Sequence, residues 1–152
     1  MDMTKADPEF FDLLVQSYRR LLGAEPVFLT DEQPHTAQRL YEDAAIAVLA
    51  HSTEAVPRFI YANRAAQACF EYDWDELVGL PSHLSADDAD RAERQRLLDA
   101  VARDGFATDY RGLRIAKSGR RFWIEDGILW QLRDSRGRLR GVAASFSQWH
   151  DA

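Results

Sequence analysis

The sequence predicts an α+β fold in which one antiparallel sheet carries its helices mainly on one face. Three observations lead to this prediction. The chain of 152 residues begins with a helical pattern, continues with two short apolar segments, and ends with three longer segments of alternating pattern. A further helical region lies between the two groups of strands. We expect one compact domain, with an N-terminal helical cap over residues 1–44 and a core over residues 45–150.

Helix signals mark both ends of the first segment. Asp7 is a typical N-cap, Pro8 fits the first helical position, and Gly23 fits the position just past the end. The apolar side chains between them form more than a narrow stripe: Phe10, Phe11, Leu14, Val15, Tyr18, Leu21 and Leu22. Such a helix must be covered, either by its own domain or by a partner. A second, shorter helix is predicted from Pro34 to Tyr41.

The two short apolar segments, residues 45–51 and 58–63, predict a β-hairpin. Asn63, the only asparagine in the chain, ends the second segment where an alanine-rich helical pattern begins. Its side chain can cap that helix, and a residue at such a junction can also contact a ligand. The capping role is favoured, and the ligand contact stays open as the alternative.

The central region contains two further helix signals. Asp73 and Glu76 have the spacing of a capping box, and Gly79 is placed to end that short turn. Ser85, with Asp88 three residues later, predicts the start of a longer helix that Gly105 closes.

The last third of the chain predicts three antiparallel strands over residues 106–116, 120–134 and 138–149, because glycine-containing turns separate them. Strict alternation in the middle strand places two sets of apolar side chains on opposite faces. The inner set is Phe122, Ile124, Ile128, Trp130 and Leu132, and the outer set includes Trp123 and Leu129.

The same alternation places Asp126 on the inner face, where an isolated charge is costly. Gly127 permits a bulge that would turn Asp126 outward, and this explanation is favoured. In the other explanation Asp126 faces a pocket, where it would hold a polar ligand or pair with an arginine such as Arg114.

Composition excludes several classes of protein. The net charge is −6, although residues 111–140 contain nine of the 19 Lys and Arg residues, as solvated strand faces and hairpin tips would. An acidic chain does not fit nucleic-acid binding. The longest apolar run, residues 44–50, is far shorter than the stretch of about 20 residues that crosses a membrane. With no signal peptide and a single cysteine, Cys69, we expect a cytoplasmic protein without membrane contact.

The stretch YANRAAQACFEYDWDELVG resembles the strand-to-helix junction of PAS domains. The matching positions are Tyr61, Asn63, Ala65, Phe70, Glu76, Leu77 and Gly79. Over roughly residues 9–149, the chain most resembles the bacterial stand-alone MEKHLA domain of the PAS superfamily. The segments that carry this similarity are SYRRLLG (17–23), LYEDAAIAVLAH (40–51), WDELVGLPS (74–82), RDGFATDYRGLRIAKSGRRFWIE (103–125) and GVAASF (141–146).

This resemblance implies a PAS-like, five-stranded antiparallel sheet whose inner face encloses a small cavity. The residues expected to line that cavity are Tyr61, Asn63, Phe70, Trp74, Leu77, Tyr110, Phe122, Ile124, Asp126 and Trp130. The resemblance also implies a homodimer formed through the N-terminal helix and the outer sheet face. Its expected contacts are Phe10, Phe11, Leu14, Tyr18, Trp123 and Leu129.

No cofactor is identified from the motifs. Cys69 lies in ACFEY, which is not the cysteine motif of flavin-binding PAS proteins, so we expect a small buried thiol. The four histidines lack metal-ligand spacing, and no metal site is expected. His83 is the candidate for a haem ligand, but its turn-like setting favours an exposed side chain.

The favoured function is a sensory or interaction module without an output domain of its own. It would bind a small organic molecule and act through an unidentified signalling partner or its own assembly. One alternative is an enzyme of the proton-transfer type that uses Asp126 and Tyr110. Another is a ligand-free dimerisation domain, because a filled core and a lined pocket need the same residue types. The side chains that would fill the core are Tyr61, Phe70, Phe122, Trp130 and Phe146.

Overall fold

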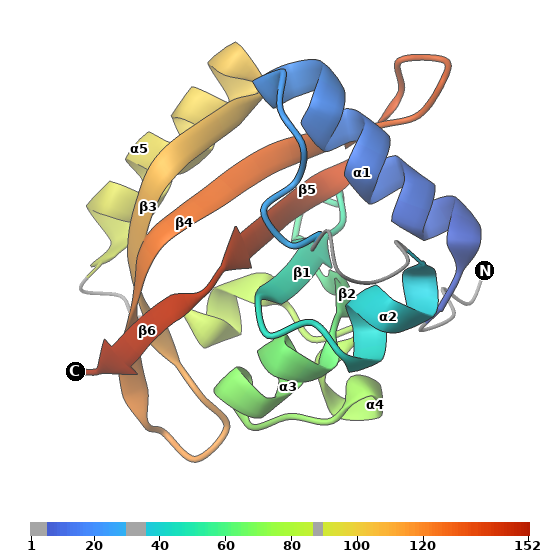
Figure 1. The fold of residues 1–152 in the computed structure, drawn as a ribbon. Helices are drawn as coiled ribbons and strands as arrows, with labels where there is room; N and C mark the ends of the chain where they lie inside the picture. The colour runs from blue at the N-terminus through green and yellow to red at the C-terminus, as the bar shows by residue number, and fades with distance from the viewer. Residues whose placement is uncertain (1–5, 30–35, 87–89) are drawn as a thin grey trace.

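The computed structural model describes residues 6–29, 36–86 and 90–152 and confirms the α+β class. Within these residues the strands form one antiparallel, six-stranded sheet in the order β2-β1-β5-β4-β3, with β6 paired to β4 (Figure 1). The strands are β1 (Ala47–His51), β2 (Phe59–Ala62), β3 (Phe106–Ile115), β4 (Arg121–Arg133), β5 (Leu139–Phe146) and β6 (Gln148–Asp151). The helices are α1 (Pro8–Leu22), α2 (Ala37–Glu42), α3 (Arg64–Phe70), α4 (Trp74–Leu77), the 3₁₀ helix η1 (Ser82–Ser85) and α5 (Arg91–Asp104).

The fifth predicted strand is present in two pieces, β5 and β6, which Ser147 separates. The pieces pair with successive parts of β4: β5 with Ile128–Arg133 and β6 with Phe122–Glu125. The predicted hairpin of β1 and β2 is also formed.

Most of the predicted helix ends are confirmed. Asp7 caps α1 by accepting a hydrogen bond from the backbone of Glu9 at 3.0 Å, and Gly23 follows the helix with φ +66°. Asp73 and Glu76 form the reciprocal capping box of α4. The second helix begins at Ala37 behind the N-cap Thr36, and its predicted start at Pro34 lies outside the described residues.

The longest central helix begins later than predicted. Ser85 belongs to η1 and its hydroxyl donates to the carbonyl of Ser82 at 2.8 Å, so it does not cap α5, which starts at Arg91. Asp88, the other half of the predicted start signal, lies outside the described residues. Gly105 ends α5 as predicted, with φ +90°.

Helices cover both faces of the sheet. Neighbouring residues of β1 alternate between two apolar clusters: Ala47 and Leu49 join the cluster with α3 and α5, and Val48 and Ala50 join the cluster under α1. Figure 1 shows α1 crossing in front of β4 and β5, with α5 behind β3. We call the α5 side the inner face and the α1 side the outer face. The N-terminal helices α1 and α2 thus cover the outer face.

The apolar first helix is covered by its own chain. The indole of Trp130 on β4 donates to the carbonyl of Leu14 at 3.2 Å, and its ring lies against Tyr18 with 5.1 Å between centroids. The hydroxyl of Ser17 accepts from the backbone N–H of Arg133 at 3.0 Å and donates to its carbonyl at 3.2 Å. α1 therefore satisfies polar groups of β4 as well as burying its apolar face.

A sharp irregularity crosses β3 and β4. On β4, Ile124 pairs with Gly112 and Gly127 pairs with Tyr110, so three steps on β4 oppose two on β3. The compensating extra residue lies on β3, and Asp109 (φ +58°) and Asp126 (φ +54°) adopt left-handed backbone conformations at the two sites. Paired bulges of this kind turn every later side chain to the other face.

The bulge corrects the predicted faces of β4. Asp126 is exposed, so the favoured bulge is confirmed and its placement in the pocket is wrong. Beyond it, Ile128, Trp130 and Leu132 pack on the outer face under α1, whereas Leu129 packs on the inner face. Strict alternation is therefore right for Phe122 and Ile124 but wrong for the residues that follow the extra residue.

Asn63 joins four separate segments through its buried carboxamide. Its Oδ1 accepts from the backbone N–H of Val48 at 3.0 Å and from that of Ala66 at 3.1 Å. Its Nδ2 donates to the carbonyls of Ile46 at 2.9 Å and Leu40 at 3.2 Å. Both amide hydrogens and the oxygen are occupied, so the capping role is confirmed and extended to α2 and β1.

Replacing Asn63 should therefore destabilise the fold more than the loss of an ordinary helix cap. We expect Asn63→Ala to lower the free energy of unfolding by about 3 kcal/mol, because four buried backbone groups lose their partner. The matched control is Thr36→Ala, which removes the exposed cap of α2 and should cost about 1 kcal/mol. Urea unfolding measures both changes, and equal losses would contradict the tertiary role of Asn63.

Candidate functional site

A cavity of about 60 Å³ lies on the inner face of the sheet, between the strands, η1 and α5. Its lining is mostly apolar. The described lining residues are Leu49, Ala50, His51, Phe59, Phe70, Ser82, Arg94, Leu97, Leu98, Tyr110, Arg114, Ile124, Leu129, Val142, Ala143, Ala144 and Phe146. Arg94 and Leu98 on α5 are half-buried, so this helix forms the edge of the cavity that faces solvent.

The polar part of the lining consists of His51, Ser82, Arg94, Tyr110 and Arg114. Arg114 reaches from β3 to two hydroxyl groups: its guanidinium donates to Tyr110 Oη at 3.4 Å and to Ser85 Oγ of η1. The same guanidinium lies 5.7 Å from the centre of the Phe70 ring. None of the described lining residues is an Asp or a Glu. The polar part is therefore rich in donors and contains no carboxylate.

His51 contributes little positive charge near neutral pH. Burial lowers the pKa of its imidazole below the ordinary value of 6.5, and the charges of Arg94 and Arg114 lower it further, against a raising hydrogen bond to the Ser52 carbonyl. The positive charge of the lining therefore comes from the two arginines.

The ring of Tyr110 lies over two glycines of the inner face. A Cβ atom at Gly112 would come within 2.5 Å of Tyr110 Oη, and one at Gly127 within 2.9 Å of its Cδ2. Glycine at these two positions therefore makes room for the ring, which packs flat against the sheet and forms part of the cavity wall.

Three of the predicted pocket residues line the cavity: Phe70, Tyr110 and Ile124. Leu77 and Phe122 are buried in the same apolar cluster without lining it, and Asn63 has no free hydrogen-bonding group. The ligand roles of these residues stay predictions.

Four of the predicted pocket positions are wrong. Asp126 is exposed at the bulge. Tyr61, Trp74 and Trp130 belong to the outer-face cluster instead, where Tyr61 packs 5.0 Å from Phe10 and 5.8 Å from Trp74 between ring centroids. For Trp130 the cause is the extra residue in β4. For Tyr61 it is a second bulge, because Ala50 pairs with Tyr61 but His51 pairs with Phe59, so Phe59 lies in the inner cluster and Tyr61 in the outer one. Trp74 packs against Tyr61 on that outer face.

The residues predicted to form the dimer contacts lie in different places in the structure. Phe10, Leu14 and Tyr18 are at most 3% exposed because α1 packs on its own sheet, so they are not available to a second copy. Leu129 faces the cavity. Phe11 and Trp123 are half-buried, and the guanidinium of Arg111 lies 3.8 Å from the centre of the Trp123 ring.

Sequence reasoning missed His51, Ser82 and Arg94 as cavity residues and considered Arg114 only as a partner for Asp126. One signal was available, because Tyr110, Gly112 and Arg114 alternate toward the inner face of β3. No local pattern marks Ser82 or Arg94, since each reaches the cavity from a helix whose position relative to the sheet is a tertiary feature.

The groups considered for redox or metal chemistry, Cys69 and His83, are not among the described lining residues of the cavity. Burial raises the pKa of the Cys69 thiol to about 12, against the lowering effect of Arg120, which fits an unreactive core residue. His83 is exposed. Within the described part of the chain, no group of three His, Cys, Asp or Glu side chains could hold a metal ion, and no helix is long and apolar enough to cross a membrane.

The structure does not bring together the acid and the tyrosine of the proton-transfer alternative. Tyr110 lines the cavity while Asp126 lies in solvent, so the acid that the enzyme alternative requires is not at the site. The cavity instead combines an apolar wall with hydrogen-bond donors, as small-molecule sites do.

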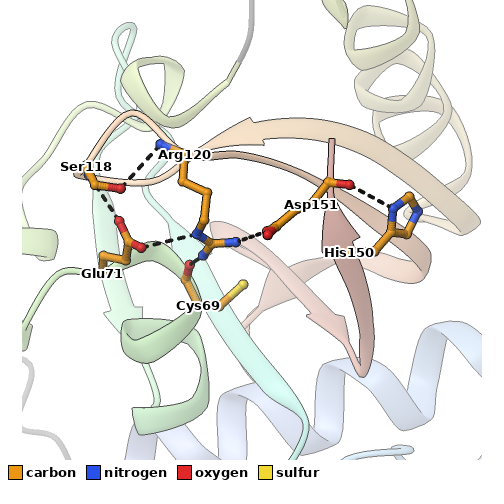
Figure 2. Close-up of polar contacts among 6 residues, drawn as sticks. All are labelled: Cys69, Glu71, Ser118, Arg120, His150 and Asp151. Carbon is orange, nitrogen blue, oxygen red and sulfur yellow. Dashed lines mark hydrogen bonds and ion pairs between the residues drawn. The ribbon is translucent and has the colours of Figure 1, made fainter.

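A second polar cluster holds the C-terminal strand β6 against the rest of the sheet through an ion pair. Figure 2 shows Arg120, which directly precedes β4, between the end of α3 and β6. Its guanidinium contacts Glu71 at 3.1 Å and Asp151 at 2.7 Å, and it donates to the carbonyl of Cys69 at 2.7 Å. One side chain therefore connects three segments that are distant in the sequence.

Comparisons with known proteins agree with this architecture. The family model of the MEKHLA domain matches residues 8–151. No curated protein matches the chain.

Solved structures of similar fold are PAS and light-oxygen-voltage domains. A PAS domain from Colwellia psychrerythraea is 16% identical with a TM-score of 0.63, over 76% of this chain and 92% of that chain. The light-oxygen-voltage domain of a blue-light-activated histidine kinase from Erythrobacter litoralis is 18% identical with a TM-score of 0.57, over 70% and 94%. The light-oxygen-voltage domain of Aureochrome1 is 17% identical with a TM-score of 0.57, over 67% and 74%. These similarities show a PAS-like fold.

The contact between Tyr110 and Gly112 can be tested by a double-mutant cycle. Gly112→Ala should lower the free energy of unfolding by about 1–3 kcal/mol, because its methyl group overlaps the Tyr110 ring. In a Tyr110→Ala background the same substitution should cost much less, since the overlap is gone. Urea unfolding of the four proteins measures the coupling, and an equal cost in both backgrounds would contradict the proposed packing.

Arg120→Gln should release β6 without unfolding the sheet. We expect faster amide hydrogen exchange at residues 148–151, with Arg136→Gln in the β4–β5 turn as the control that leaves this exchange unchanged.

Acid should have a similar effect on the wild type. Hydrogen bonds from Ser118 and Arg120 lower the pKa of Glu71 below its ordinary value of 4.5. Its stabilising contribution is therefore complete above pH 4.5 and is lost as the pH falls through the lowered value. As the pH falls through that range, amide hydrogen exchange at β6, corrected for the intrinsic rate, should rise less in Arg120→Gln than in the wild type. An equal rise in both proteins would argue against the ion pair between Glu71 and Arg120.

Proposed function

The chain belongs to the MEKHLA domain family, and from this membership and the cavity on its PAS-like sheet we propose that it is a sensory or regulatory module that binds a small organic molecule. The observation that supports this proposal best is the cavity itself. Large side chains such as Phe70 and Phe146 border it without filling it, and its wall combines apolar groups with a cluster of donors.

The size of the cavity favours a small ligand. A volume of about 60 Å³ is well below the roughly 300–1,000 Å³ of sites for drug-sized molecules. A light-oxygen-voltage domain of similar fold, whose mechanism was studied with a flavin analogue, raises the question of a flavin. Against a flavin stand this volume and Cys69, which is not among the described lining residues and whose thiol has a raised pKa.

Occupancy of the cavity would be transmitted through β4 to the N-terminal helix. Leu129 faces the cavity, and the next residue, Trp130, packs under α1 and donates to Leu14. A ligand that shifts this part of β4 acts on both faces of the sheet at once, because the strand is tightly packed on each side. We infer that α1 carries the change to a signalling partner.

A role as a dimerisation or protein-interaction domain is the second candidate. It is supported by the half-buried Phe11 and Trp123, which lie on different parts of the molecule surface from the cavity. Sensing and dimerisation are compatible, since a ligand-dependent change in α1 would alter the surface that surrounds Phe11.

Native mass spectrometry tests whether a molecule is bound. The native mass of the protein should exceed its denatured mass, and the excess should be lost on denaturation. Ala144→Leu should remove the excess mass from a folded protein, because it adds a larger side chain to the cavity wall. The control Ala68→Leu changes an exposed alanine of α3 and should keep the excess mass.

A native mass equal to the denatured mass at every collision energy would contradict the proposal. The same spectra distinguish monomer from dimer and so test the predicted homodimer directly.

A further inference from the structure

The two arginines of the cavity differ from the other described arginines of this region. Arg96, Arg111 and Arg120 each pair with a carboxylate. Arg94 and Arg114 line the cavity with no carboxylate partner within residues 6–29, 36–86 and 90–152. Two arginines from different elements, α5 and β3, thus line one cavity whose described residues include no carboxylate.

Both guanidinium groups of this pair are only partly solvated, because Arg94 and Arg114 are half-buried. Burial lowers the pKa of Arg94 below its ordinary value, and the charge of Arg114 lowers it further. The charge of Arg114 therefore disfavours the charged form of Arg94. An anion placed between them would remove this penalty, because opposite charges interact strongly where water is partly excluded.

Two buried polar atoms at the cavity have no hydrogen-bond partner among the described residues. They are Nε of Arg114, a member of the arginine pair, and Oγ of Ser82. Ser82 is only 2% exposed and lines the cavity. Buried polar groups in native proteins are almost always satisfied by protein, ordered water or a bound group. These two atoms therefore mark the part of the cavity wall at which a polar ligand group can form hydrogen bonds. Arg114 Nε is solely a donor and the hydroxyl of Ser82 can donate, which matches an acceptor such as a carboxylate.

The rest of the cavity fits an apolar body. Leu97 of α5, Ile124 of β4 and Phe146 of β5 line it together with other aliphatic side chains. The small volume restricts that body to a short chain or a single ring.

We propose that the cavity binds a small organic carboxylate, with its carboxylate group between Arg94 and Arg114 beside Ser82 and its apolar part against the sheet. This inference rests on the proposed function, because it specifies the chemistry of the molecule that the cavity binds. Charge-assisted hydrogen bonds to guanidinium groups are roughly twice as strong as neutral ones, so the carboxylate dominates recognition.

The test is a titration of the full chain with butyrate, hexanoate and benzoate and with the neutral primary amide of each acid. Binding is measured by calorimetry and by amide NMR. We expect at least one carboxylate to bind about tenfold more tightly than its amide, with shifts at cavity residues. Arg94→Gln should weaken that binding by about tenfold, and Ser82→Ala should weaken it by a smaller factor. The matched control is Arg96→Gln, which removes the same charge from the exposed side of the same helix and should leave affinity unchanged.

Each other outcome overturns a defined part of the proposal. Equal affinity for a carboxylate and its amide would end the carboxylate inference and leave ligand binding intact. Equal weakening of carboxylate binding by Arg94→Gln and Arg96→Gln would mean that only the overall charge of α5 matters. That result would also end the carboxylate inference. Absence of binding by all acids and amides, in a protein whose native and denatured masses agree, would overturn the inference and the proposed function together.

Discussion

The carboxamide of Asn63 is the interaction on which the rest of the structure depends. Four backbone groups from α2, the segment before β1, β1 itself and α3 are buried at one point, and each would be costly to leave without a partner. A single side chain with two donors and a two-fold acceptor satisfies them all. It therefore sets the direction in which α3 leaves the sheet, and with it the position of the helices that close the cavity.

The paired bulges at Asp109 and Asp126 give the sheet two different covered faces. Before the bulge, Phe122 of β4 faces inward and packs against Phe70. After it, Leu129 turns to the cavity while Trp130 turns to α1, so one strand serves both apolar clusters. The close approach of Tyr110 to Gly112 and Gly127 at the same place lets its ring lie flat, and this leaves a cavity where a larger neighbour would push the ring inward.

The cavity is chemically one-sided. It carries two guanidinium groups and two hydroxyl groups, from Ser82 and Tyr110, but none of its described residues supplies a carboxylate. Membership of the MEKHLA family together with a PAS-like fold leaves the ligand open, because different sites can be built on one fold. The chemistry of the site narrows the choice of ligand, since two half-buried guanidinium groups with no carboxylate among the described lining residues favour an anionic acceptor.

The sequence by itself determined the features that depend on close neighbours in the chain. The caps at Asp7, Asp73 and Asn63, the turn at Gly105 and the order of strands and helices follow from local patterns, because each rests on contacts within a few residues. The tertiary structure decided which side chains meet across the sheet. One extra residue in β4 reverses the face of everything after it, and Ser82, Arg94 and Arg114 meet only because η1, α5 and β3 pack around one cavity. Periodicity reports which positions are apolar along one element, but the face that a strand presents after a bulge is set by pairing with its neighbours.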